Sequence, residues 1–455
     1  MNKAILFVAA SVLGLSPIEI KGQSFIHSDS GALFLPRGIK YQPNAAPNQY
    51  GDPLSNQQVC LRDAPILQQL GVNLIYVTNA APQINGHGEC MQVLQDAGIY
   101  VLLDLPSSNF NITDQYTSAV YRHYLEIADE FSRYNNTLGL MVASNVQPDY
   151  QPLVKAAIRD LRQNMNGRRL PLGYSHDDIL TKKLSQVMMG CGEKADFFAV
   201  DISDNCEYST LKEASMIGKH MKPFHGPTFF SGFGCKGLSH PRQFEEASVV
   251  FSNRSGGIFN DYSAQSSLSL VDIQGSEVIL KEEYFNAQKA IFKPFDPKNI
   301  TPDYIPYLYE CAENSFVLPP TPDESLCTCA LQNLQCVASD KAKLGYGTNE
   351  TATLYQRLCQ QGFCAEVKPN LKKNFYPKYS HCEFDVQLSI ALNAAKLSGI
   401  PCHFGGLAAP AKISETSPAC HLQERLSPET TADSSGKSLI KAGWAAAPLV
   451  LFVLI

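Results

Sequence analysis

The stretches IYVLLDL at residues 99–105 and LGLMVAS at residues 138–144 decide the fold class. Both are near-continuous apolar runs, which is typical of strands buried on both faces of a sheet. Similar runs recur along the chain, separated by segments with helical spacing such as 118–134 and 150–164. We predict eight strands, at residues 38–42, 72–78, 99–104, 138–144, 170–175, 197–202, 228–233 and 257–262. Eight β/α units over about 250 residues favour an α/β fold, a (β/α)8 TIM barrel, although a doubly wound sheet fits the same periodicity almost as well.

The composition of the whole chain narrows the class of protein. Its 455 residues are 44% hydrophobic and 18% charged, and the net charge is −6. The hydrophobic fraction supports a real core and excludes disorder throughout. The acidic balance excludes a broadly basic nucleic-acid binder. We expect no nucleic-acid partner, no cofactor and no metal.

The N-terminal residues 1–16 have the pattern of a secretory signal peptide. Lys3 precedes a short apolar run, and the small residues Gly14 and Ser16 stand at positions −3 and −1 of a cut before Pro17. The run is too short to span a bilayer. The competing interpretation is a buried N-terminal helix, which the order of these features disfavours.

The C-terminal residues have the pattern of a glycosylphosphatidylinositol (GPI) attachment signal. A small polar stretch at 430–436 precedes an apolar tail at 442–455 that carries no charge. Ser434 is the expected attachment residue, and 435–455 would be the removed propeptide. A hydrophobic terminal helix packed on a domain is the alternative. Together the two ends predict a secreted protein at the outer face of the plasma membrane, held there by the GPI lipid.

Cysteines and sequons agree with an oxidising compartment. Fourteen cysteines, six at 60–311 and eight at 327–420, predict a disulfide framework and a small disulfide-rich module at 327–420. A zinc site at Cys327 and Cys329 competes, but the spacing is wrong for the usual pairs. Five N-x-[ST] sequons suggest a glycoprotein; they begin at Asn111, Asn135, Asn253, Asn299 and Asn349. The expected order is a barrel at 17–293, a Pro-rich linker at 294–326, the module at 327–420 and a stalk at 421–434.

The active site of a TIM barrel lies at the C-terminal ends of its strands. None of the eight predicted strands ends in Glu, although some end near Asp. His176 and Asp177 are interpreted as loop residues, because no G-x-S-x-G serine motif exists. Gly256 and Gly257 are interpreted as a tight strand entry, because no phosphate-loop motif follows them.

An ordered set of segments resembles the fungal β-1,3-glucanosyltransferases of glycoside hydrolase family 72. The segments are PIEIKGQSF, RGIKYQP, DPLSNQQVC, RDAPILQQLGVN, DAGIYVLLDL, YNNTLGLMVASNV, VKAAIRDLRQ, LPLGYS, KADFFAVD, FFSGFGC and SGGIF, followed by the Pro-rich linker, the eight-cysteine module and the GPI tail. The module resembles carbohydrate-binding module family 43 and is expected to be mainly helical. The resemblance implies a retaining (β/α)8 enzyme at the fungal cell wall that cuts an internal β-1,3-glucan bond, holds the glycosyl chain covalently and transfers it to another glucan.

The chain departs from this family at both catalytic positions. The family's acid/base glutamate, in a motif like G-N-E-V, aligns with Asn145, and its supporting asparagine aligns with Ser144. The family's nucleophile, in F-S-E-Y-G-C, aligns with Gly232. An asparagine cannot cycle a proton as acid and base, and a glycine cannot form a glycosyl ester.

The residues that bind sugar in the family are only partly retained. Tyr41, Gln42 and Asp104 match it and are the expected substrate-binding residues. Aromatic positions of the family align with Ser203, Asn205 and Asn260, so the surface for stacking sugar rings is poorer. The resemblance also implies seven disulfides: Cys60–Cys90, Cys191–Cys311, Cys206–Cys235, Cys327–Cys382, Cys329–Cys420, Cys336–Cys402 and Cys359–Cys364.

Three hypotheses for function follow. The main one is a catalytically degenerate family member that persists as a glucan-associated wall protein, with β-1,3-glucan or another wall polysaccharide as its partner. The second is an active transglycosylase with relocated carboxylates, for which Asp204 and Asp261 are the candidates. The third is a structural surface glycoprotein that does not bind glucan.

Overall fold

The computed structural model describes residues 14–43, 51–82, 87–112, 115–177, 188, 192–203, 226–234, 250–251, 256–263, 269–292, 317–344, 349–411 and 420. The chain divides into two compact units, one of residues 1–115 and 120–315 and one of residues 116–119 and 316–455. We describe each unit by itself.

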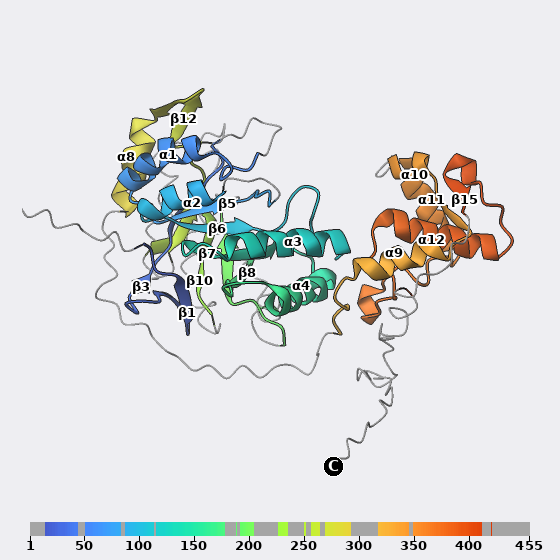
Figure 1. Ribbon diagram of the computed structural model, residues 1–455. Helices are drawn as coiled ribbons and strands as arrows, with labels where there is room; N and C mark the ends of the chain where they lie inside the picture. The colour runs from blue at the N-terminus through green and yellow to red at the C-terminus, as the bar shows by residue number, and fades with distance from the viewer. Residues whose placement is uncertain are drawn as a thin grey trace, which may run out of the picture. The chain divides into compact units, whose positions relative to one another are not determined.

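Eight parallel strands close into a barrel in the first unit (Figure 1). Their order around the barrel is β10, β11, β4, β5, β6, β7, β8, β9, so each strand neighbours the next in sequence. The strands are β4 (Arg37–Lys40), β5 (Leu74–Val77), β6 (Tyr100–Asp104), β7 (Thr137–Ser144), β8 (Leu172–His176), β9 (Phe197–Asp201), β10 (Thr228–Phe233) and β11 (Gly257–Phe259). All eight match a predicted strand, which confirms the (β/α)8 barrel and excludes the doubly wound sheet.

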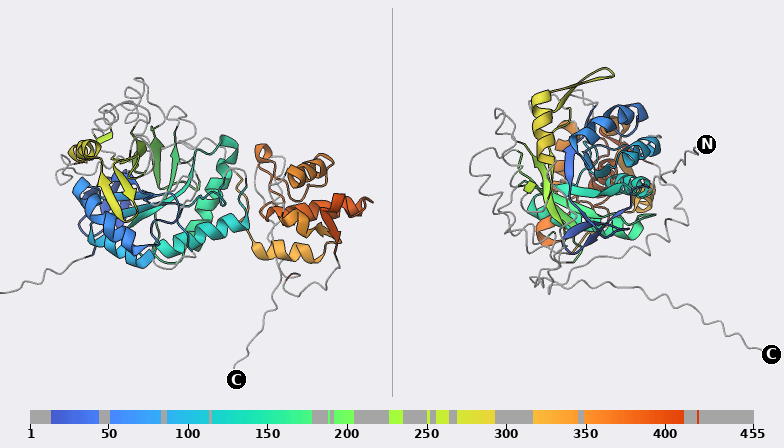
Figure 2. Two further views of the ribbon diagram at one scale, coloured as in Figure 1. Left: turned by 90° about the horizontal axis from the view of Figure 1, so that it is seen from above. Right: turned by 90° about the vertical axis from the view of Figure 1, so that its left-hand side faces the viewer.

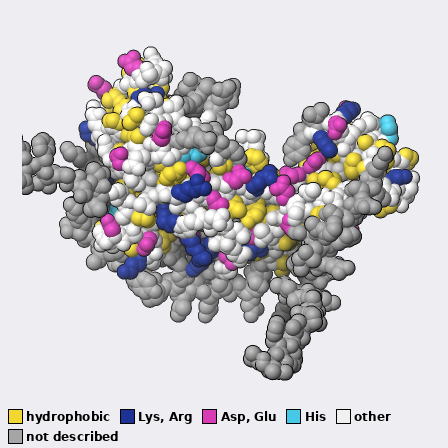
Figure 3. All heavy atoms as spheres, viewed as in Figure 1, with side chains coloured by type: hydrophobic (Ala, Val, Ile, Leu, Met, Phe, Trp, Pro, Cys, Tyr) yellow, Lys and Arg dark blue, Asp and Glu magenta, His cyan; other side chains and the backbone are white. Residues whose placement is uncertain are grey.

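Helices pack outside these strands, as Figure 2 shows. They are α1 (Gln57–Leu70), α2 (His87–Asp96), α3 (Ser118–Phe131), α4 (Gln151–Asn164), preceded by the 3-10 turn η1 (Pro148–Tyr150), and α8 (Glu282–Phe292). Local chemistry sets the ends of α1: the Asn56 side chain accepts a hydrogen bond from the Gln58 N–H, and Gly71 ends the helix in a left-handed conformation at φ 80°. The polar faces of these helices meet water, and side chains of both signs are mixed over the surface in Figure 3.

A three-stranded antiparallel sheet covers the N-terminal end of the barrel. It comprises β1 (Ile18–Lys21), β2 (Ser24–His27) and β3 (Leu33–Phe34). The Phe25 ring lies 5.7 Å from Phe197 and 6.1 Å from Phe229, two residues at the beginnings of barrel strands. This sheet closes the bottom of the barrel with aromatic side chains, and we did not predict it because its strands are short.

A second antiparallel pair follows the last barrel strand. It is the hairpin of β12 (Val271–Gln274) and β13 (Glu277–Leu280), which leads directly into α8. This hairpin was also not predicted.

The second unit is mainly helical, as expected. It contains α9 (Glu324–Gln332), α10 (Asp340–Leu344), α11 (Asn349–Gln360), α12 (Phe384–Leu397), the turns η4 (Leu371–Lys373) and η5 (Phe404–Gly406), and a small sheet of β14 (Cys336–Ala338) and β15 (Ala408–Pro410). Its core combines apolar side chains from α9, α11 and α12 with half-cystines. Burying sulfur bridges in this way suits a unit with little core area.

Five of the seven expected disulfides are present among the described residues. They are Cys60–Cys90, Cys327–Cys382, Cys329–Cys420, Cys336–Cys402 and Cys359–Cys364. Cys191, Cys206, Cys235 and Cys311 lie outside the described residues, and so do Ser434 and the expected GPI tail. No helix within the described part is long and apolar enough to cross a bilayer.

The expected glycosylation positions that the structure describes are accessible. Asn111, Asn135 and Asn349 are exposed, whereas Asn253 and Asn299 lie outside the described residues. Exposure is what a bulky glycan requires.

Candidate functional site

Asn145 directly follows the C-terminal end of β7. Its backbone is left-handed, with φ 52°, a conformation that asparagine tolerates better than most residues. The side-chain amide oxygen of Asn145 accepts a hydrogen bond of 2.8 Å from the backbone N–H of Asp177. The backbone N–H of Asn145 donates to the Ser175 carbonyl at 3.1 Å. The exposed side chain is therefore fixed against the loop after β8 and offers no group that exchanges a proton near neutral pH.

Gly232 lies near the end of β10, opposite Asp201 on β9 in the parallel register. A Cβ atom at position 232 would lie closer than 3.0 Å to both carboxylate oxygens of Asp201. Such an approach is shorter than real Cβ contacts, so the space beside Gly232 is already occupied. The position expected to carry a nucleophile has no side chain and no room for one unless Asp201 moves.

Asp201 is held in place by two neighbours. The Lys40 ammonium at the end of β4 lies 3.3 Å from Asp201 Oδ2, and Ser203 donates to Oδ1 from its hydroxyl at 2.5 Å and its N–H at 3.0 Å. Burial alone would raise the pKa of Asp201, but Lys40 and the Ser203 bonds outweigh it and hold the pKa below its usual value. Asp201 is therefore an ionised, paired carboxylate at neutral pH.

Asp104 at the end of β6 is a second carboxylate in this region. It accepts a short hydrogen bond from the Tyr76 hydroxyl on β5. Burial raises the pKa of Asp104 to about 7, against the opposing effects of the Tyr76 bond and the positive Lys40. Two carboxylates at the same end of the barrel thus have pKa values displaced in opposite directions.

The structure separates the expected substrate-binding residues. Tyr41 is fully buried, and its hydroxyl donates to Asp63 Oδ2 of α1 at 2.8 Å, so it belongs to the wall behind the site. Gln42 is partly exposed and donates from Nε2 to the Thr78 hydroxyl at 2.9 Å. Gln42 and Asp104 therefore lie nearer to the mouth of the barrel than Tyr41.

The remaining candidates form no catalytic arrangement among the described residues. His176 Nδ1 lies 3.4 Å from Asp177 Oδ1, and Asp177 is exposed in a loop. Asp261 Oδ1 accepts a bond of 3.3 Å from the Ser263 N–H, and Asn260 is buried. Asp204 and Asn205 lie outside the described residues.

One cluster in the second unit has metal-ligand residue types. Cys327, His381 and Cys382 offer three atoms within 4.8 Å of one another. Cys327 and Cys382 are joined in a disulfide, so their sulfurs are not available as thiolate ligands.

The sequence did not single out Lys40, Tyr76 or the contact between Asp201 and Gly232. Asp201 lies one residue before the end of the predicted strand at 197–202, and Gly232 lies in the next predicted strand. Aligning these two parallel strands would have placed the residues side by side. Lys40 lies 161 positions before Asp201, and only closure of the barrel brings them together.

Comparison with known proteins identifies the family. The glucanosyltransferase model of glycoside hydrolase family 72 matches residues 8–294. Together with the (β/α)8 barrel, this match shows that the chain belongs to the family 72 glucanosyltransferases.

Curated relatives and solved structures agree with this membership. Protein EPD1 of Candida maltosa is 32% identical over 86% of this chain and 76% of its own length. A 1,3-beta-glucanosyltransferase of Arthroderma benhamiae is 31% identical over 92% of this chain and 87% of its own length. The crystal structure of Saccharomyces cerevisiae Gas2 with laminaritriose and laminaritetraose superposes with a TM-score of 0.73 and 29% identity, covering 87% of this chain and 97% of that one.

Proposed function

We propose that this chain is a β-1,3-glucan-associated protein of the fungal cell wall that does not perform double displacement at the family's catalytic positions. One observation carries the proposal: a side chain at position 232 would overlap the Asp201 carboxylate. Asn145 at the second position adds to it, since an amide cannot act in turn as acid and base. A retaining transglycosylase needs two carboxylates about 5 Å apart, one of which becomes the covalent glycosyl ester.

The proposed ligand follows from similarity. Gas2 was solved with laminaritriose and laminaritetraose, and this chain shares its fold over nearly its whole length. Gln42 and Asp104 are the proposed sugar-binding residues of the barrel mouth. We further propose that residues 327–420 are a carbohydrate-binding module, that a signal peptide at 1–16 directs secretion, and that Ser434 carries the GPI anchor.

Product analysis of β-1,3-glucan oligosaccharides tests the proposal. The purified secreted chain is incubated with laminaritetraose, beside S. cerevisiae Gas2 at equal concentration, and products are measured by mass. We expect Gas2 to form longer and shorter oligosaccharides and this chain to leave its substrate unchanged. Longer and shorter products from this chain would contradict the proposal.

A binding titration distinguishes the remaining possibilities. Saturable binding of laminaritetraose without turnover supports a glucan-associated protein. Absence of both turnover and binding would instead support a structural surface glycoprotein. Repeating the titration with Gln42→Ala tests whether the barrel mouth contributes, because an unchanged affinity would direct attention to the module.

A second candidate function rests on Asp104 and Asp201. A pair of carboxylates whose pKa values are displaced in opposite directions is the pattern of an acid and a base at one site. In an active transglycosylase with relocated carboxylates these residues would replace the expected Asp204 and Asp261. Asp201→Asn and Asp104→Asn would then each abolish any turnover found, whereas Asp261→Asn would leave it unchanged.

A further inference from the structure

The two residues before Pro17 are part of the folded barrel unit. Leu15 is half-buried and packs against the hydrophobic cluster at the bottom of the barrel, to which the sheet of β1 to β3 contributes. The carbonyl of Ser16 accepts a hydrogen bond of 2.6 Å from the hydroxyl of Tyr100 on β6, and the Ser16 hydroxyl donates to Asp29 Oδ1 at 2.9 Å. Leu15 and Ser16 therefore continue the packing and hydrogen bonding of β1 toward the N-terminus.

The bond from Tyr100 to Ser16 matters because Tyr100 lies in the interior. Tyr100 is 1% exposed, and its hydroxyl has a second neighbour, Nδ1 of His27, at the longer distance of 3.3 Å. A buried hydroxyl that loses its hydrogen-bond partner destabilises the fold, because its desolvation is no longer compensated. Removing Ser16 would take away the shorter of the two bonds.

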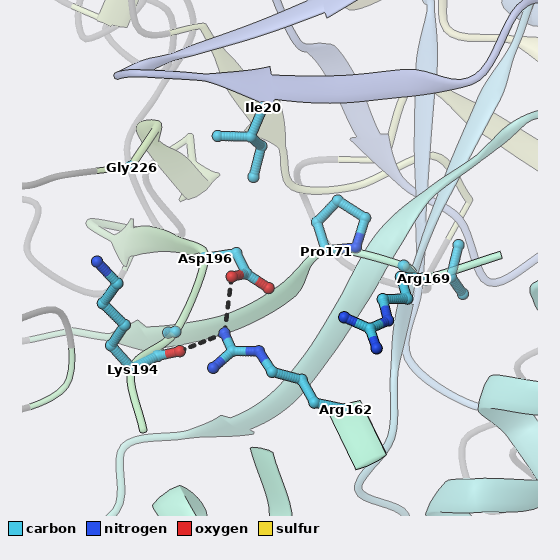
Figure 4. A pocket seen from close by; sticks show the side chains of 9 residues that line it. Ile20, Arg162, Arg169, Pro171, Lys194, Asp196 and Gly226 are labelled. Atoms are coloured by element: carbon cyan, nitrogen blue, oxygen red, sulfur yellow. Dashed lines mark hydrogen bonds and ion pairs between the residues drawn. The ribbon is translucent and has the colours of Figure 1, made fainter. Parts of the chain in front are cut away.

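The C-terminal half of β1 is packed less completely. Ile20 is half-buried, and Figure 4 shows it at the edge of a pocket of about 410 Å³ that Pro171 and Asp196 also line. A side chain that borders a cavity has fewer dispersion contacts on that side. By contrast, Ile18 is 1% exposed. The attachment of β1 to the barrel thus depends mainly on its N-terminal half, which Leu15 and Ser16 extend.

The sequence allows the signal peptide to end before Leu15. A signal peptidase acts after a small residue, and Gly14 stands directly before this bond, with the short aliphatic Val12 at position −3. The alternative cut before Pro17 places a proline after the bond, where the amide has no N–H and φ is fixed. That cut would also discard Leu15 and Ser16, which the folded barrel uses.

We propose that the signal peptide is removed between Gly14 and Leu15, so that Leu15 and Ser16 become the first residues of the mature chain and hold β1 on the barrel. Hydrolysis of this peptide bond by a signal peptidase adds one water molecule and leaves a carboxyl group on Gly14 and an amino group on Leu15. The inference rests on the signal peptide proposed above and moves its cut upstream from Pro17. It does not depend on whether the barrel mouth binds glucan.

Mass analysis of the N-terminal peptide tests the position of the cut. The chain is secreted from a eukaryotic host with its own signal peptide, purified, and digested with trypsin, which cleaves after Lys21. We expect a peptide of residues 15–21. A peptide of residues 17–21, or any other new N-terminus, would overturn the proposal. An uncut N-terminus would refute the proposed signal peptide as well.

Two substitutions to the same residue type locate the bond independently. Ser16→Gln should be processed normally, because position 16 lies beyond the proposed bond. Gly14→Gln is the positive control, because a long side chain directly before the bond should block the peptidase. Failure to process Ser16→Gln, or normal processing of Gly14→Gln, would contradict a cut before Leu15.

Thermal unfolding tests the structural reason for the cut. A chain that begins at Leu15 is compared with one that begins at Pro17. The shorter chain should unfold about 2–4 °C lower, because it lacks the hydrogen bonds of Ser16 and the packing of Leu15. Lys21→Ala, which changes an exposed side chain of β1, is the control and should leave the unfolding temperature unchanged. Equal unfolding temperatures for the two chain lengths would show that the fold does not need these residues and would overturn the inference.

Discussion

At the scale of single residues, the side chain of Asp201, and not the backbone conformation, restricts position 232 to glycine. The carboxylate of Asp201 fills the space into which a side chain would project, and Lys40 holds it there at 3.3 Å. The absence of a side chain on β10 and the presence of the ion pair are therefore parts of one packing arrangement.

Gly232→Ala is expected to lower the free energy of unfolding by about 1–3 kcal/mol, the usual cost of forcing an extra group into a packed site. Thermal and urea unfolding measure the change. Gly51→Ala is the matched control, because nothing lies within 4 Å of a Cβ at that position. Equal stability of the two variants would contradict the packing at Gly232.

The raised pKa of Asp104 predicts how the folding stability of the chain depends on pH. Its pKa is raised from 3.8 to about 7, so the folded chain holds this proton more tightly than the unfolded chain. Between these two values stability falls as pH rises, and above about pH 7 this contribution becomes constant. Relative to Asp104→Asn, the original chain should thus lose stability between pH 4 and pH 7.

Urea unfolding of both proteins across that range measures the effect. Asp96→Asn, which changes an exposed carboxyl at the end of α2, serves as the control. A difference between the original chain and Asp104→Asn that does not vary with pH would rule out the raised pKa.

At the scale of elements, one disulfide joins the first two helices of the barrel. Cys60 on α1 and Cys90 on α2 close a loop with a sequence separation of 30, whereas Cys359–Cys364 closes one of 5. Replacing both Cys60 and Cys90 by Ala should lower the free energy of unfolding by about 2–4 kcal/mol. Replacing Cys359 and Cys364 should lower it by about 1.6 kcal/mol less, because closing a shorter loop removes less entropy from the unfolded chain. Calorimetry of each variant compares the two losses, and an equal or larger loss for the shorter loop would refute this account.

The barrel strands were predictable because burial on both faces leaves a continuous apolar run in the sequence. Residues 99–104 and 138–144 lie within one residue of β6 (Tyr100–Asp104) and β7 (Thr137–Ser144). The sheet of β1 to β3 was not predictable from the sequence, because its strands of two to four residues are too short to show a periodic pattern. Their pairing depends on contacts with Phe197 and Phe229, which lie far along the chain.

The candidate site was predictable only in part. Family resemblance located Asn145 and Gly232, because both follow from alignment of strand ends. It did not reveal that Tyr41 is fully buried or that Asp201 fills the space beside Gly232. Those facts depend on side-chain directions and on strand register after the barrel closes, which a single sequence does not encode locally.

At the scale of the whole molecule, the two units differ in what stabilises them. Most of the buried hydrophobic residues that the structure describes belong to the barrel unit, where one disulfide is described, whereas the described part of the second unit contains four disulfides within its core. We expect two unfolding transitions in calorimetry, one for each unit. Dithiothreitol should lower the unfolding temperature of the second unit more than that of the barrel, because small domains depend on cross-links. The barrel expressed alone identifies its own transition. A reductant that shifts both transitions equally would contradict this division.

The ion pair of Lys40 and Asp201 also restricts which residues can stand at position 232. A single codon change can place Glu at position 232, but the new side chain would meet the Asp201 carboxylate before any catalytic benefit arose. Clearing that space by changing Asp201 first leaves the Lys40 charge without its partner. Each one-step mutational path to a side chain at position 232 is therefore expected to begin with a loss of folding stability, either from the contact with Asp201 or from the unpaired Lys40.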